Sequence, residues 1–327
     1  MIEVPFSSAI PLKNYLSGID ITFDIDNIKD SLVIAAKDVI EVISEAVYSD
    51  LLAKIETDPE DEDDAAKYEE AIQLLRYCLV PLAMYHHFPI LQVRVGNNGL
   101  TTPKSDNETA AYKYQVDELR ENMLLRHGVY LKELIDYIDA NADSDKEIFK
   151  DWIDSDAQAE QKKLLITSYK EFDKYFRIDG DAGYFMRIRE ILKDITMQKI
   201  EPFTGSISDI LAADPPDAVL LAKIKKALAY YTVSQTVFEW DYYYMPAPVR
   251  RAAKDIMQAN PNSSIKNNPG ESDKSYLMAR FKNVADGIMR DVENYLAAKK
   301  ISDAAPLDDV VLPSIEQDAS DSYIFMM

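Results

Sequence analysis

The sequence predicts a mainly α-helical protein with two pseudo-repeated helical bundles, a small β-hairpin excursion and extended termini. Long stretches place apolar residues every three or four positions, which is the period of a helix. Glycine is rare, with 9 residues in a chain of 327, so few tight turns are expected. The same order of elements also occurs twice along the chain, whose length exceeds the size at which one core usually divides into two.

The predicted N-terminal arm covers residues 1–26, where prolines oppose helix formation. Asp24 or Asp26 then suits the N-cap of a first amphipathic helix that continues to Leu52. The acidic run that follows, residues 58–64, is expected to be a solvated loop, because a calcium site would need a glycine to bend the chain.

Helical repeat 1 is predicted over residues 27–142 and is built around the most apolar stretch of the chain. This stretch begins as a helix whose apolar residues occupy too many faces for a surface helix. These residues are Ile72, Leu74, Leu75, Tyr77, Leu79, Val80, Leu82 and Tyr85. The helix is therefore expected to be central and buried.

A β-hairpin is predicted near residues 90–103, directly after the buried helix. Apolar and polar residues alternate over residues 91–95, which is the period of a strand, and Asn98-Gly99 is a strong hairpin-turn signal. A long helix over residues 108–141 then completes the first bundle.

Residues 143–180 are predicted to form a helical connector, and residues 181–300 to form helical repeat 2. The second bundle follows the order of the first, with helices expected over residues 184–199, 218–239 and 273–300. Residues 301–327 form an acidic C-terminal tail. It ends in apolar residues that are costly to leave in water, so we expect it to dock on its own body or on a neighbour.

Charge and cysteine content exclude several classes of protein. A net charge of -21 repels phosphate backbones, so we expect no direct nucleic-acid binding, sequence-specific or otherwise. The single cysteine, Cys78, excludes an intramolecular disulfide framework and favours a reducing compartment. No run approaches the roughly 18 apolar residues of a membrane span. We expect a soluble, cytoplasmic protein with no membrane partner.

Few residues are suited to catalysis or metal binding. His86 and His87 are neighbours and point in different directions, so they are expected to cap the buried helix and not to share a metal. Cys78 is expected to be an inert core thiol, in preference to one half of a Cys-His nucleophile pair. Asp179 and Asp181 occupy calcium-loop positions, but Tyr184 stands where that loop needs glycine, so a capped helix start is preferred. We predict no catalytic, cofactor or metal residue.

The candidate interaction residues lie in the hairpin, in the aromatic segment of residues 240–246 and in the tail. They are Val93, Val95, Asn98, Trp240, Tyr242, Tyr243, Tyr244, Tyr323 and Phe325. Tyrosine and tryptophan combine a large apolar area with a polar tip and are enriched where proteins touch one another. The alternative, that the aromatic segment borders a helical core, stays open. The first interpretation describes a subunit that joins copies of itself.

Four sequence segments carry a resemblance to a known family. They are the D-x-D-N-I-K-x-S pattern at residues 24–31, Y-S-D-L-L at residues 48–52, His86-His87-Phe88 before the hairpin, and A-L-A-Y-Y at residues 227–231. With this order of elements the chain resembles a family of uncharacterised proteins encoded by phages and prophages of Bacteroidetes. It is also similar to the helical head-tail connector, or adaptor, proteins of tailed phages.

The resemblance implies a non-enzymatic virion structural protein of the phage neck. Such a subunit would form a ring-like homo-oligomer, contact portal and tail proteins, and pass from the cytoplasm of the bacterial host into the virion. An acidic inner wall would let DNA slide through the ring, because like charges prevent phosphate contacts. Two alternatives stay open: an enzyme or small-molecule-binding protein with a site at the junction of the two halves, and a monomeric helical interaction scaffold.

Overall fold

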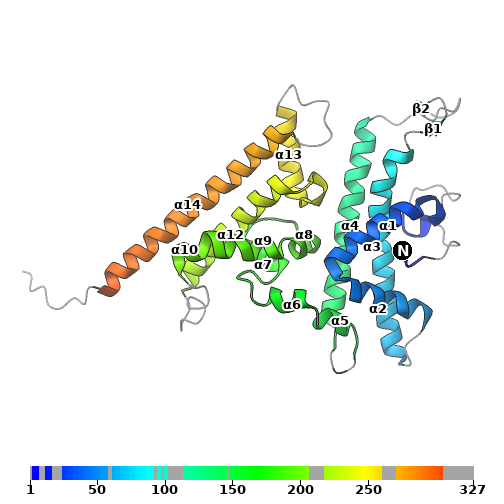
Figure 1. Ribbon diagram of the computed structural model, residues 1–327, viewed down its shortest axis with the longest axis horizontal. Coiled ribbons are helices and arrows are strands. Elements are labelled where there is room, and N and C mark those ends of the chain that lie inside the picture. The colour runs from blue at the N-terminus through cyan, green and yellow to red at the C-terminus, as the bar shows by residue number, and fades with distance from the viewer. Residues whose placement is uncertain are drawn as a thin grey trace, which may run out of the picture.

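The computed structural model shows two groups of helices lying side by side (Figure 1). The mainly α-helical prediction is confirmed. The structure describes residues 2–6, 12–16, 24–57, 61–91, 94–96, 99–101, 113–143, 145, 147–205, 217–259 and 270–304. Among the helices within these ranges, none combines the length and apolar character that a bilayer span requires. The C-terminal tail was predicted to begin at residue 301, but the last long helix continues to Ala304; residues 305–327 lie outside the described residues.

The first half is built on a pair of long helices, α3 (Glu62–Leu91) and α4 (Lys113–Asn141), which pack along each other. Helix α1 (Lys29–Ile43) packs against α3, and α2 (Glu45–Glu56) follows it. The prediction that the apolar helix is central is confirmed, because α3 buries residues on all sides. They include Ala71, Ile72, Leu75, Cys78, Leu79, Val80, Leu82, Ala83 and Met84.

The first predicted helix is divided at Ser44, which the sequence pattern did not reveal. Ser44 adopts a φ of 78° and accepts a hydrogen bond on its hydroxyl from the backbone N–H of Val47, so it ends α1 and caps α2. The apolar period continues through the break, which is why the pattern alone suggested one helix. Asp24 caps a 3-10 turn, Ile25–Ile28, that leads into α1, since its carboxylate accepts from the N–H of Asn27 at 3.3 Å; α1 itself begins after Ile28, which makes no side-chain cap.

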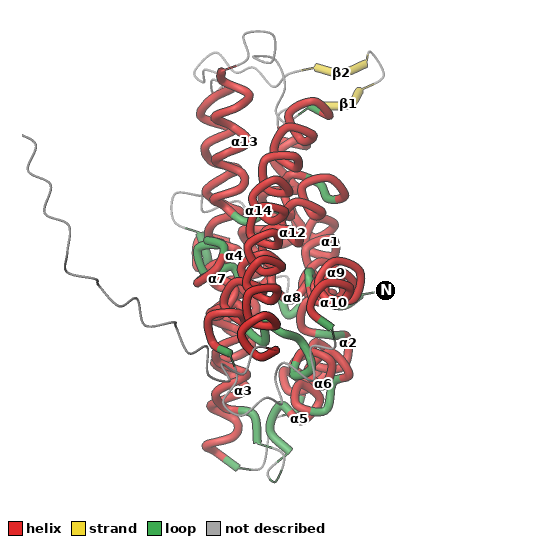
Figure 2. The backbone as a smooth tube through the Cα atoms, turned by 90° about the vertical axis from the view of Figure 1, so that its left-hand side faces the viewer, coloured by secondary structure: helices red, strands yellow, loops and turns green. Residues whose placement is uncertain are grey.

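The predicted hairpin is present. Strands β1 (Arg94–Gly96) and β2 (Gly99–Thr101) pair antiparallel, with Val95 opposite Leu100. Figure 2 shows the hairpin at the same end of the molecule as α13. Val93 and Asn98, two of the candidate interaction residues, lie outside the described residues.

Short helices connect the halves, as the predicted helical connector over residues 143–180 implied. These are α5 (Lys150–Ile153), α6 (Asp156–Gln161) and α7 (Tyr169–Tyr175). The helix expected over residues 184–199 is three segments: α8 (Ala182–Arg187), α9 (Arg189–Ile195) and a π-helical turn (Thr196–Ile200), followed by α10 (Glu201–Thr204). The turn at Ile188 separates α8 from α9 and directs α8 toward the first half.

The second half repeats the plan of the first. Helix α12 (Ala218–Glu239) packs along α14 (Glu271–Ala304), as α3 packs along α4, and α9 packs against α12 as α1 packs against α3. Helix α13 (Ala247–Ala259), which the sequence did not predict, lies in the excursion between the two long helices. The expected bounds of α12 are those observed, because Asp217 accepts a hydrogen bond from Leu220 N–H and caps its start.

The two halves share one continuous hydrophobic core, where the chain length had suggested two cores. Helix α8 packs against both α1 and α4 of the first half. A Cβ on Gly183 would lie 2.6 Å from Cδ2 of Leu131, so the close approach of α8 to α4 depends on a glycine at this position. Because α8 joins the two halves so closely, the junction between them is a fixed structural feature.

Candidate site at the junction of the two halves

A buried carboxylate links the halves. Asp38 lies in the middle of α1 and is only 7% exposed. Its Oδ2 accepts a hydrogen bond from the hydroxyl of Tyr243, and its Oδ1 accepts one at 3.3 Å from Tyr244. Nε2 of His86, on α3, lies 3.4 Å from the same carboxylate. A buried charge is stable only when such partners replace its water, and here the two hydroxyls come from the opposite half.

Arg187 of α8 makes a second connection at the same place. Its Nη2 donates to the backbone carbonyl of Asp38 at 3.0 Å, and its guanidinium lies 5.2 Å from the centre of the Tyr244 ring. Three residues of the second half, Arg187, Tyr243 and Tyr244, therefore contact one residue of α1. Below, these three residues together with Asp38 and His86 are called the Asp38 cluster.

The Asp38 cluster holds Asp38 ionised and Tyr243 protonated near neutral pH. Burial acts to raise the pKa of Asp38, but the nearby His86 imidazole, the hydrogen bond from Tyr243 and the charge of Arg187 outweigh it, so the pKa lies below its ordinary value. Burial and the neighbouring Asp38 charge raise the pKa of Tyr243. Asp38 and Tyr243 therefore form a charge-assisted hydrogen bond, which is stronger than a hydrogen bond between two neutral groups.

Aromatic rings enclose the Asp38 cluster. The ring of Tyr85, on α3, stacks on that of Tyr243 with centroids 5.4 Å apart and an interplanar angle of 18°. The guanidinium of Arg120, on α4, lies 4.6 Å from the centre of the Tyr85 ring. Tyr243 and Tyr244 also touch, with centroids 4.1 Å apart. These contacts fix the Tyr243 ring from both halves.

The structure places the predicted aromatic residues inside the chain's own junction. Trp240, Tyr242, Tyr243 and Tyr244 are each half-buried, and the Tyr242 hydroxyl donates to the carbonyl of Arg250 at 3.0 Å. The contacts of these residues support the alternative interpretation, in which the aromatic segment borders a helical core. Tyr323 and Phe325 lie outside the described residues.

Sequence reasoning did not identify Asp38, although one signal was present. Asp38 lies three residues after Ala35 and four before Val42, both fully or nearly fully buried, so it occupies the buried face of its helix. A carboxylate there needs partners from elsewhere in the fold. In a chain with 57 acidic residues, this one did not stand out.

The histidines lie in the helices and contact neighbouring elements. The expected cap role of His86 and His87 is wrong, because α3 continues to Leu91. His86 contacts Asp38, and Nδ1 of His87 lies 3.3 Å from the hydroxyl of Ser31. Both residues therefore attach the end of α3 to α1.

Cys78 and His127 form a buried pair that the sequence did not predict. The Cys78 Sγ lies 3.3 Å from Nδ1 of His127, which is also 3.1 Å from the Cys78 carbonyl. Burial raises the pKa of the Cys78 thiol and lowers the pKa of His127 to about 4. Both side chains are neutral near pH 7, and a nucleophilic cysteine must be a thiolate. The pair matches the expected inert core thiol.

Asp179 and Asp181 have structural partners. Asp181 caps α8 by accepting from the N–H of Tyr184 at 2.8 Å, as the capped-start interpretation expected. Asp179 is 2.6 Å from both Arg177 and Arg251. Within the described ranges no group of three or more His, Cys, Asp or Glu residues is arranged to hold a metal ion.

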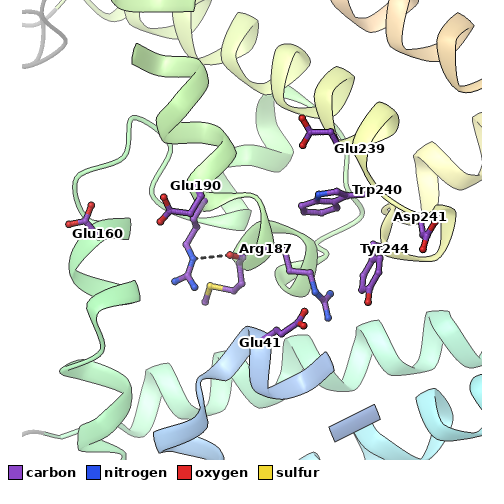
Figure 3. A pocket seen from close by; sticks show the side chains of 10 residues that line it. Glu41, Glu160, Arg187, Glu190, Glu239, Trp240, Asp241 and Tyr244 are labelled. Atoms are coloured by element: carbon purple, nitrogen blue, oxygen red, sulfur yellow. Dashed lines mark hydrogen bonds between the residues drawn. The ribbon is translucent and has the colours of Figure 1, made fainter. Parts of the chain in front are cut away.

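A cavity of about 760 Å³ opens beside the Asp38 cluster (Figure 3). Both halves line it, since Glu41 comes from α1 and the other residues come from the connector and the second half. The lining consists of Glu41, Glu160, Met186, Arg187, Arg189, Glu190, Glu239, Trp240, Asp241 and Tyr244. Figure 3 shows Glu41 and Arg187 pointing toward one another across the junction. Carboxylates, two guanidinium groups and two aromatic rings thus converge on one space.

The fold and the junction define a mainly α-helical protein of two similar halves, locked together at a buried carboxylate beside a polar cavity. The chain belongs to the DUF6712 family, a family of unknown function, which its sequence matches over residues 37–162 and 188–302. The first matched segment covers most of the first half and the beginning of the connector, and the second covers the second half from residue 188, after α8. No curated protein and no solved structure matches the chain.

Proposed function

We propose that the protein is a non-enzymatic structural subunit that assembles with copies of itself and with partner proteins, as a head-tail connector in the neck of a phage virion. The observation that supports assembly best is a group of exposed apolar side chains in the second half. Met197, Phe203 and Val219 are 52%, 53% and 57% exposed. They lie on the π-helical turn, α10 and the start of α12. The π-helical turn contacts the other two elements.

An interface that covered these three side chains would gain about 1 kcal/mol for each half-exposed residue, at roughly 25 cal/mol per Å² of apolar area. Single exposed apolar residues are common on monomeric proteins. Met197, Phe203 and Val219 favour a partner because they lie on elements that contact one another. The described contacts of the aromatic segment are within the chain, so this end of the second half replaces that segment as the candidate surface.

Two further features support a structural role. Cys78 and His127, which resemble a nucleophile with its base, are buried and neutral. The net charge of -21 suits a ring through which DNA passes without adhering. The neck location rests on the resemblance to phage adaptors.

Light scattering tests the assembly proposal. The chain alone should form a ring-sized oligomer, or should co-migrate with a phage portal protein. Phe203→Ser and Val219→Ser should each weaken that association, because they remove apolar area from the proposed contact surface. Val129→Ser is the matched control, since Val129 is 53% exposed but lies on α4. A clean monomer that does not bind the portal would contradict the proposal.

The cavity favours a second candidate function, the binding of a small molecule at the junction. Its volume falls within the roughly 300–1,000 Å³ range of small-molecule pockets, and sites between structural units are common. This candidate does not require assembly.

A further inference from the structure

We propose that the junction cavity binds a small organic cation, an amine or guanidinium compound with an apolar portion. The inference rests on the second candidate function and is independent of the assembly proposal. The cavity, its aromatic walls and its charged groups together specify the ligand class.

Two aromatic rings provide fixed walls. Trp240 and Tyr244 have centroids 6.4 Å apart at an interplanar angle of 71°, so they meet as a corner. Trp240 is held by an edge contact with the buried ring of Tyr184, and Tyr244 by its hydrogen bond to Asp38. The faces of such rings attract cations, and tryptophan does so most strongly. Arg187 already lies over the Tyr244 ring, so the ammonium group of a ligand would contact the Trp240 ring, and an apolar stem would lie between the two rings.

Negative groups outnumber positive ones in the cavity lining, which carries five carboxylates and two guanidinium groups. Among the described residues no hydrogen bond or ion pair holds Glu41, Glu190 or Asp241, although Glu41 points toward Arg187 and the charge of Glu190 acts on Arg189 and Lys193. Glu160 is different, because it pairs with Lys163 at 2.6 Å and Lys193 at 3.0 Å. Hydrogen bonds from these lysines lower the pKa of Glu160 to about 2. Carboxylates from both halves therefore give the cavity an excess of negative charge, which favours a cation.

Both arginines of the cavity make contacts within the chain. Arg187 donates from Nη2 to the Asp38 carbonyl and lies against Tyr244, although its buried Nε has no hydrogen-bond partner among the described residues. Arg189 donates to the Met186 carbonyl at 2.9 Å. Nη1 of Arg189 also donates to Gln161 at 3.3 Å. An anionic ligand would compete with these contacts and would face the five carboxylates. A cationic ligand meets attraction from the carboxylates and the rings at once.

Binding is tested on the purified full chain at a concentration where light scattering shows a single species. Agmatine and spermidine are titrated calorimetrically at low ionic strength, with magnesium chloride at matched ionic strength to measure general charge screening and succinate as the anionic comparison. The chain has two tryptophans, and Trp240 lines the cavity, so its fluorescence reports occupancy directly. Saturable binding of one amine per chain with a fluorescence change is expected, and succinate should not bind.

Variants separate the cavity from the general acidity of the protein. Glu41→Gln combined with Asp241→Asn should weaken amine binding about 10-fold or more, because it removes two of the five carboxylates that line the cavity. Glu69→Gln combined with Glu133→Gln changes the net charge equally at exposed positions on α3 and α4 and should leave binding unchanged. All four substitutions are at exposed positions, so the melting temperature should be retained.

Three outcomes would overturn the inference: no saturable binding at millimolar amine, an equal loss in both double variants, or displacement by magnesium at matched ionic strength. The first outcome would show that the cavity does not bind amines, and the other two would show that amine binding depends only on the net charge of the protein. Failure here would leave the assembly proposal intact, because that proposal is measured by mass and co-migration.

Discussion

The hydroxyl of Tyr243 donates a hydrogen bond to the carboxylate of Asp38, although 205 positions separate the two residues in the sequence. This contact joins the segment after α12 to the middle of α1 and connects the two halves at a buried charge. Each prediction below tests a part of the junction or of the core beside it.

Asp38→Asn should destabilise the protein by about 2–3 kcal/mol, because it replaces a charge-assisted acceptor and leaves buried donors poorly matched. Urea unfolding measures the change. Asp30→Asn, an exposed substitution on the same helix, should change the free energy of unfolding by less than about 0.5 kcal/mol. Equal effects of the two substitutions would show that Asp38 does not join the halves.

Tyr243→Phe should destabilise the protein by about 1–1.5 kcal/mol, because only the hydroxyl is lost and the stacked ring stays in place. In the double variant with Asp38→Asn, the two losses should not add, since each removes the same hydrogen bond. Simple additivity in this double-mutant cycle would rule out the direct contact.

Acid should destabilise the protein through His127. The folded pKa of His127 is lowered to about 4 from an ordinary value of 6.5, so the unfolded chain binds a proton at a pH where the folded chain does not. The contribution of neutral His127 to the free energy of unfolding is complete above the pKa of His127 in the unfolded chain. It is lost as the pH falls toward the pKa of His127 in the folded chain, at about 1.4 kcal/mol per pH unit.

His127→Gln should make the free energy of unfolding less dependent on pH between the two pKa values of His127, whatever the substitution does to that free energy near neutral pH. The measurement is the free energy of unfolding by urea over the interval between the two pKa values. Asp38 responds in the same direction at lower pH, because its folded pKa is lowered and its contribution is lost as the pH falls through that value. An unchanged slope in the variant would exclude His127 as the source.

Cys78 should resist alkylation by iodoacetamide in the folded protein. It is fully buried, and burial raises its thiol pKa, so both access and thiolate formation are suppressed. Mass spectrometry should show labelling only after denaturant is added. Rapid native labelling would mean that α3 and α4 separate readily.

Gly183→Ala should destabilise the protein by about 1–3 kcal/mol, because the new methyl group would displace the buried side chain of Leu131. Gly128→Ala is the matched control on α4, where nothing lies within 4 Å of the added Cβ. That control should stabilise the protein by about 0.5–1 kcal/mol, since alanine favours helix more than glycine does. A neutral result for Gly183→Ala would show that α8 can move away from α4.

The sequence was sufficient to predict the elements that depend on residues close together in the chain. The bounds of α12 follow from its apolar period and from the cap at Asp217, and the hairpin follows from strand alternation and Asn98-Gly99. Helical content and the order shared by the two halves follow from the same periodic pattern. These features depend on residues only a few positions apart.

The tertiary structure alone decided what lies at the junction. The pairing of Asp38 with Tyr243, the neutral Cys78–His127 pair and the cavity at Glu41 and Trp240 each join residues from distant segments, and no short pattern encodes their distance. Burial also determined their chemistry, because the same residue types would be ordinary surface groups in water. Periodicity therefore predicted the long paired helices but missed α13 and the break at Ser44, while the packing of α8 against α1 and α4 determined which side chains meet.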